Sequence, residues 1–163
     1  MNKATDLVIV SFLDDHKEGN TFVRSKHGGW PLHITIYPWF GVKNFDKFEQ
    51  ELTSITEFTR PFIVEVGEER MFGKDQDVPV RIIENQSNLI KLHKKFDEIV
   101  ASDGELFDSS WIRDKYNAHI TFHHGARMPV EGEAVEVNHV YLVKMLDDDN
   151  CRFLKKYPLG AKL

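Results

Sequence analysis

The sequence predicts an α+β fold with a mainly antiparallel sheet, and three observations lead to this prediction. Segments with strand-like apolar character outnumber segments with helical spacing. The two helical segments are separated by a pair of strand-like segments joined through glycine, which is typical of an antiparallel hairpin. The 163 residues are enough to bury one hydrophobic core, so we expect one domain spanning residues 1–163.

The strands are predicted from short apolar or alternating runs. They comprise residues 7–13, 32–37, 62–66, 78–83, 118–124 and 134–146, with a last short strand at 152–157. The polar residues 14–29 are expected to form a long loop. Pro38 is expected to end the second strand, because proline cannot donate a backbone hydrogen bond.

Two amphipathic helices are predicted from apolar residues spaced by three, four and three. The first covers residues 44–60, with Asn44 as its N-cap and an apolar face made of Phe45, Phe48, Leu52 and Ile55. The second helix has Ser87 as its predicted N-cap and ends before Gly104. Its apolar face is made of Leu89, Leu92, Phe96 and Ile99.

Composition excludes several classes of partner. The formal net charge of -5 provides no basic field for long duplex nucleic acid. The single cysteine, Cys151, cannot form an internal disulfide, and no basic segment followed by a long apolar one begins the chain. No apolar run is long enough to cross a bilayer. We therefore expect a cytoplasmic monomer that does not insert into membranes.

The most informative feature is a tetrapeptide pattern that occurs twice. His33-Ile34-Thr35-Ile36 and His119-Ile120-Thr121-Phe122 each place histidine and threonine on one face of a predicted strand. The apolar residues on the opposite face are expected to be buried and to fix the direction of the polar face. Either motif alone is typical of a structural histidine, whereas the pair indicates a shared site.

Two histidines and two threonines supply the groups needed to cleave a phosphodiester. One neutral imidazole can act as a base on the attacking oxygen, while a protonated imidazole donates to the leaving oxygen. The threonine hydroxyls can donate hydrogen bonds to the non-bridging phosphate oxygens without adding charge. This chemistry requires no cofactor or metal.

With these paired motifs the chain resembles the 2H phosphoesterases, which include the 2′-5′ RNA ligase-like proteins and RNA 2′,3′-cyclic phosphodiesterases. The resemblance covers most of the chain and implies a bilobal fold with pseudo-two-fold symmetry and a central cleft. It implies metal-independent catalysis by His33 and His119, with Thr35 and Thr121 binding the phosphate. The expected substrate is a small nucleotide cyclic phosphate or an RNA terminus with a 2′-5′ or 2′,3′-cyclic end.

One departure from the family pattern concerns the residues around the second motif. Many relatives have proline before the second histidine and arginine shortly after the motif, whereas this chain has Ala118 and then His123-His124. His123 shares the strand face of His119, so it is either a substrate-binding residue in the cleft or a solvent-exposed histidine at the strand end. His124 is interpreted as a structural residue and His93 as a surface residue.

Aromatic residues near the motifs could stack on a nucleobase. Tyr37 is the first candidate, because strand alternation places it on the face of His33. Trp30, Trp39, Phe40, Trp111 and Tyr116 are further candidates, with core packing as the default for each.

Two other classes of function stay open. A non-catalytic module could bind RNA ends or nucleotides on the same scaffold, although binding alone would not need two histidines. A metal-dependent hydrolase could use the histidine-rich second half. His119 and His123, however, would lie roughly 13 Å apart along a strand, too far to share one ion.

Overall fold

The computed structural model describes residues 3–24, 29–106, 111–123 and 126–163. The strands are β1 (Ala4–Phe12), β2 (Thr21–Val23), β3 (His33–Val42), β4 (Phe62–Phe72), β5 (Val78–Ile83), β6 (Gly104–Leu106), β7 (His119–Thr121), β8 (Ala134–Val137), β9 (His139–Met145) and β10 (Asn150–Pro158). The helices are α1 (Phe45–Glu57), α2 (Ser87–Asp103) and the short 3-10 helix η1 (Arg113–Lys115). This arrangement confirms the predicted α+β class.

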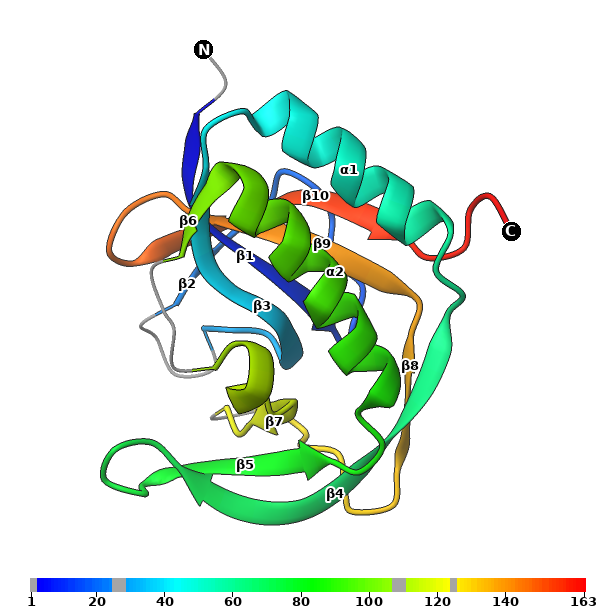
Figure 1. Ribbon diagram of the computed structural model, residues 1–163. Helices are drawn as coiled ribbons and strands as arrows, with labels where there is room; N and C mark the ends of the chain where they lie inside the picture. Colours follow the sequence, from blue (N-terminus) through cyan, green and yellow to red (C-terminus); the bar gives the residue numbers. More distant parts are fainter. Residues whose placement is uncertain (1–2, 25–28, 107–110, 124–125) are drawn as a thin grey trace.

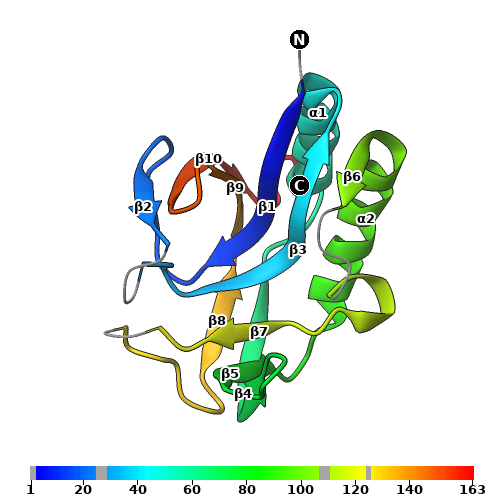
Figure 2. The same cartoon turned by 90° about the vertical axis from the view of Figure 1, so that its left-hand side faces the viewer.

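The strands form one continuous antiparallel sheet in the order β2-β10-β9-β1-β3-β7-β5-β4-β8, and β6 pairs with β3 outside this path. Figure 1 shows α1 and α2 on the same side of the sheet, with the β4–β5 hairpin extending beyond them. Figure 2 shows β1 and β3 side by side in the middle of the molecule. The histidine strands β3 and β7 are therefore neighbours at the centre of the sheet.

The main core lies between the helices and one face of this sheet. The apolar residues predicted for the two helices pack there, with Leu52, Leu89 and Phe96 fully buried. Asn44 caps α1 as predicted and accepts a hydrogen bond from the backbone N–H of Lys47. Ser87 is the first residue of α2 rather than its cap, because Gln86 precedes the helix and uses its side chain elsewhere.

A smaller apolar cluster covers the opposite face beside the histidines. It consists of Val8, Val10, Phe12, Tyr141, Val143, Cys151 and Phe153, and partly buried Phe22, Trp30, Trp39 and Met145 pack against it. The segment predicted as a loop contains β2, which pairs with β10 over this cluster. Among the residues that the structure describes, no helix is long and apolar enough to cross a membrane.

The path of β3 differs from the prediction. Pro38 does not end the strand, which continues to Val42. Ile9 on β1 pairs with Tyr37 while Val10 pairs with Thr35, so β3 has one extra residue there, a β-bulge at Ile36. Both Ile36 and Tyr37 are consequently buried. The prediction that Tyr37 shares the face of His33 is wrong, because the bulge breaks the alternation.

His93 lies in the core rather than on the surface. It is 1% exposed. Its Nδ1 contacts the carbonyl of Ile36 at 2.8 Å, and its Nε2 accepts the backbone N–H of Arg113 at 2.8 Å. These partners require the neutral ring to carry its proton on Nδ1. His93 thereby fixes the start of η1, where Arg113 has a positive φ of 55°.

The burial of His93 predicts a loss of stability in acid. Burial lowers the pKa of His93 below its ordinary 6.5, so below that pH the unfolded chain binds more protons than the folded protein. The stabilising contribution is present above pH 6.5 and is lost as pH falls through the folded pKa. The free energy of unfolding, measured with urea at about pH 7.5 and pH 5, should depend less on pH for His93→Gln than for the wild type. The difference in slope should be up to about 1.4 kcal/mol per pH unit. An identical pH dependence in the variant would contradict this account.

Candidate active site

The two histidine motifs lie directly against each other in the sheet. Ile34 of β3 pairs with Ile120 of β7, and both are completely buried on the helix side. Continuing this antiparallel register by one residue each way places His33 opposite Thr121 and Thr35 opposite His119. Side chains opposite each other on one face are about 5 Å apart at Cβ. The register thus assembles two His–Thr pairs related by an approximate two-fold axis through the isoleucines.

Each histidine is oriented by the same local contact. The Nδ1 of His33 lies 2.9 Å from the carbonyl of Pro31, and the Nδ1 of His119 lies 2.8 Å from the carbonyl of Asn117. A carbonyl only accepts, so each neutral ring holds its proton on Nδ1. Both Nε2 atoms are then unprotonated and available for proton transfer.

The four predicted residues line one pocket of about 300 Å³. His33, Thr35, His119 and Thr121 are all half-buried in it, together with His123. The other lining residues are Val8, Arg24, Trp30, Pro38, Trp39, Trp111, Tyr116 and Asn117. A pocket of this size is within the range of small-ligand sites.

Burial favours the neutral form of both histidines in the free protein. Removal from solvent is the main reason that the pKa of His33 is lowered to about 4; the Pro31 carbonyl opposes this effect, and the neighbouring His123 and His119 add to it. Burial also lowers the pKa of His119, against the opposing effect of the Asn117 carbonyl. A bound phosphate would favour the protonated form of either ring. Binding of an anion in the pocket would therefore promote protonation of one of the two rings.

Aromatic rings surround the histidines. The Trp30 ring centroid lies 4.6 Å from that of His33, and Phe72 packs edge-on against His119 at 4.9 Å. Trp111 stacks on Phe72 at 5.4 Å and is 36% exposed. Four of the aromatic residues that were candidates for stacking on a nucleobase line the pocket: Trp30, Trp39, Trp111 and Tyr116.

Tyr37 and Phe40 do not reach the pocket. Tyr37 is 1% exposed and donates a hydrogen bond of 2.6 Å to Asp97, on the helix side of the sheet. Burial and the Asp97 carboxylate raise the pKa of its hydroxyl. Phe40 is fully buried in the main core. The prediction that these two rings stack on a nucleobase is therefore wrong, because both are buried in the core.

The residues after the second motif only partly follow the prediction. β7 ends at Thr121, and Phe122 is half-buried rather than part of the core, with the Arg81 guanidinium 5.8 Å from its ring centre. His123 remains in the pocket, with its ring 6.1 Å from that of His33. Its Nε2 is buried and has no hydrogen-bond partner within the described residues. His124 lies outside those residues.

Gln86 positions the second motif and was not predicted. Its Oε1 accepts the backbone N–H of Ala118 at 2.8 Å, while its Nε2 contacts the Asn117 side chain at 2.7 Å and the Ile83 carbonyl at 3.0 Å. One amide side chain thereby holds the segment just before His119 against the end of β5. Sequence patterns contain no signal for such a contact, because it joins residues 32 positions apart.

Replacing Gln86 by alanine should reduce turnover while leaving the fold intact. The buried N–H of Ala118 would lose its acceptor, at a cost of about 1–3 kcal/mol, and His119 would lose part of its support. We expect a decrease in kcat of about tenfold with a smaller change in KM. Asn85→Ala is the matched control, since Asn85 is exposed and, among the described residues, its side chain forms hydrogen bonds with Ser87 alone. Equal kcat values for the Gln86→Ala variant and the wild type would contradict the positioning role.

In the part of the chain that the structure describes, no group of three or more His, Cys, Asp or Glu side chains could hold a metal ion.

A central antiparallel sheet that pairs two His-x-Thr motifs across one pocket defines a 2H phosphoesterase scaffold. The family model of the 2′-5′ RNA ligase superfamily matches residues 13–149. The chain belongs to this superfamily.

Solved structures share the fold at low sequence identity. The protein TT0787 of Thermus thermophilus is 15% identical, with 96% of this chain and 99% of that chain covered at a TM-score of 0.60. LigT of E. coli complexed with 3′-AMP is 15% identical, with coverage of 95% and 98% and a TM-score of 0.60. A structure described as a phosphoesterase is 14% identical, with coverage of 95% and 98% and a TM-score of 0.59. A comparison with curated proteins gives no match.

Proposed function

We propose that this protein is a phosphoesterase that acts on a ribose cyclic phosphate or on a 2′-5′ or 2′,3′-cyclic RNA end, by acid-base catalysis with His33 and His119. The observation that carries the proposal is the pairing of Ile34 with Ile120, which brings both His–Thr pairs into one pocket. A binding module would need donors for the phosphate, but not two imidazoles with free Nε2 atoms. A cytoplasmic, monomeric state stays a prediction.

The reaction divides between the two rings. A neutral Nε2 accepts a proton from water as the water oxygen bonds to phosphorus, and the other ring, protonated, donates its proton to the ribose oxygen as the P–O bond breaks. Hydrolysis of a 2′,3′-cyclic phosphate gives a phosphate monoester and a free hydroxyl. Thr35 and Thr121 donate hydrogen bonds to the non-bridging oxygens. His123, with its unpartnered Nε2, is proposed as a further contact to the substrate.

Nucleotide complexes of a structural neighbour support the class of ligand. LigT of E. coli has been crystallised with 3′-AMP, with ATP and with NADP+. We propose that this chain likewise binds a small nucleotide, with the phosphate between the histidines.

A turnover screen tests the proposed function. Its substrates are 2′,3′-cyclic nucleotides, cyclic-ended oligoribonucleotides, 2′-5′ dinucleotides and ADP-ribose cyclic phosphate, each assayed with and without a chelator. The proposal expects turnover of at least one of them that the chelator does not change. Activity that is lost with the chelator and restored by a divalent ion would overturn the metal-independent mechanism, and absence of turnover with binding retained would favour the binding module.

A further inference from the structure

A second and larger cavity shares the lining residue Trp30 with the histidine pocket. Its volume is about 780 Å³, compared with about 300 Å³ for the pocket. Its walls come from the segment after β1, the segment before β3, residues 126–129, and strands β8 to β10. Both volumes are typical of sites for small ligands. We call it the second cavity.

The two spaces share one lining residue, Trp30. Trp30 lines both of them and lies 4.6 Å from His33 between ring centres. Pro31 lines the second cavity, and its carbonyl is the group that accepts the Nδ1–H of His33 at 2.9 Å. Trp30 therefore forms part of the wall of both spaces, directly beside His33.

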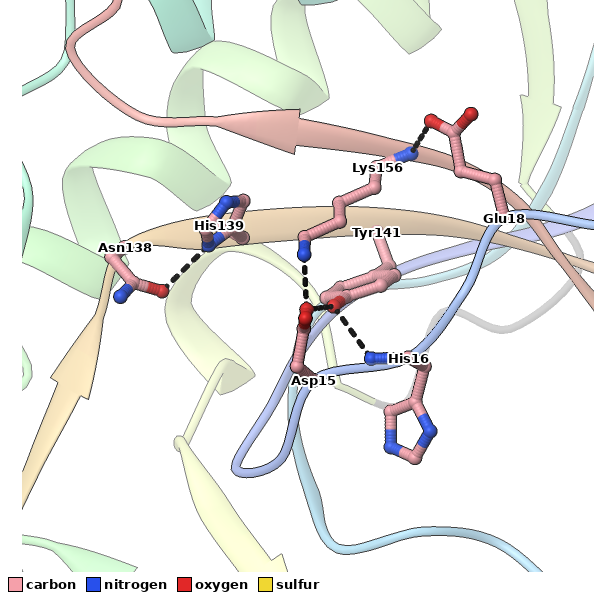
Figure 3. Close-up of polar contacts among 7 residues, drawn as sticks. All are labelled: Asp15, His16, Glu18, Asn138, His139, Tyr141 and Lys156. Carbon is pink, nitrogen blue, oxygen red and sulfur yellow. Dashed lines mark hydrogen bonds and ion pairs between the residues drawn. The ribbon is translucent and has the colours of Figure 1, made fainter.

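The charge of the second cavity disfavours a second phosphate. Four carboxylates line it, from Asp14, Asp15, Glu133 and Glu136, against two cations, Arg127 and Lys156, which gives a formal charge of -2 with histidine neutral. Both cations are already paired. Lys156 pairs with Asp15, as Figure 3 shows, and Arg127 lies 3.0 Å from Glu133.

The remaining polar groups suit an uncharged ligand with hydroxyl groups. Asp14 and Glu136 form no hydrogen bond or ion pair within the described residues, so their oxygens can accept from hydroxyls. Carboxylates bind ribose hydroxyls in this way in dinucleotide sites. Asn138 uses its Oδ1 for His139 at 2.7 Å, which leaves its amide N–H groups as donors (Figure 3).

We infer that the second cavity is a subsite for an uncharged nucleoside joined to the phosphate between His33 and His119. This inference rests on the proposed function and narrows its substrate class. The best substrates are phosphodiesters with an unphosphorylated nucleoside beyond the reacting phosphate. A cyclic mononucleotide leaves this cavity empty, and a further phosphate on the distal ribose meets the free carboxylates.

Calorimetric binding tests this subsite without relying on turnover. Three ligands are titrated into His119→Ala protein, which should bind without cleaving: a nucleoside 2′,3′-cyclic phosphate, a 2′-5′ dinucleoside monophosphate, and the same dinucleoside with a phosphate on the distal ribose. Addition of Glu136→Ala should raise the Kd of the unphosphorylated dinucleoside about tenfold relative to that of the cyclic nucleotide, through loss of a hydrogen bond to a charged acceptor. It should lower the Kd of the phosphorylated dinucleoside, through loss of repulsion.

Glu131→Ala is the matched control, because Glu131 is exposed nearby, carries the same charge and does not line the cavity. Glu131→Ala should leave the Kd of each dinucleoside, relative to the Kd of the cyclic nucleotide, unchanged. If Glu136→Ala changed all three Kd values by one factor, or none of them, the subsite assignment would be wrong. Failure of the proposed function is a separate result: the wild type would turn over neither the cyclic nucleotide nor the dinucleoside, whatever the binding ratios.

Discussion

Replacement of His33 or His119 by alanine is expected to reduce kcat/KM on a confirmed substrate by about 10² to 10⁴ fold. Each substitution removes one proton-transfer group, and general acid-base catalysis contributes an effect of this size. Both rings are half-buried on the pocket side of the sheet, so the fold should persist. Initial rates measure the loss, while circular dichroism and urea unfolding check the fold.

The threonine variants provide the comparison. Thr35→Ala and Thr121→Ala remove a hydrogen bond to the phosphate but no proton transfer, so they should retain more activity than either histidine variant. The rings also act on one substrate, so the double histidine variant should lose much less than the product of the two single losses. An unchanged rate for His33→Ala would exclude this residue as acid or base.

The second large effect expected is a bell-shaped pH dependence that differs between kcat and kcat/KM. Activity falls in acid when the base is protonated, and falls in alkali when the acid loses its proton. The kcat/KM profile reports the free enzyme, where burial lowers the pKa of both His33 and His119. The kcat profile reports the complex, where the phosphate raises both. The kcat/KM maximum should therefore lie at lower pH than the kcat maximum, by on the order of one pH unit.

Initial rates between about pH 4 and pH 9, with a substrate whose charge is constant over this range, give both profiles. The two rings flank one anion, so the apparent pKa values belong to the pair. A kcat/KM maximum at higher pH than the kcat maximum would contradict the free-enzyme electrostatics. A flat profile with chemistry rate-limiting would contradict the paired-histidine mechanism.

Local periodicity was sufficient to predict most of the fold. The spacing of Phe48 and Leu52, and of Leu89 and Phe96, identified helical faces that are buried as expected. Alternation within each His-Ile-Thr segment placed Ile34 and Ile120 in the core and the histidines in a pocket. These features depend on residues close in sequence, which is why the pattern alone reveals them.

The errors arose where distant partners decide the structure. The side chain of Tyr37 lies in the core because β1 pairs with β3 through a bulge. No property of residues 32–38 alone specifies that register. The sequence does not reveal the burial of His93, because only the fold brings its two partners, the Ile36 carbonyl and the Arg113 N–H, to its ring. The contacts of Gln86 and the position of Trp30 in the walls of both cavities likewise depend on tertiary structure.

The most direct test of paired acid-base catalysis is a leaving-group comparison in the two histidine variants. The rates of His33→Ala and His119→Ala, relative to the wild type, are measured on a ribose phosphodiester and on an activated aryl phosphodiester of the same nucleotide. An aryl oxide leaves without protonation, so the variant that lacks the acid should recover most of its rate on the aryl substrate, while the variant that lacks the base should stay slow. Recovery in one variant alone would assign both roles. Equal relative losses on both substrates, in both variants, would contradict the division of proton transfer between His33 and His119.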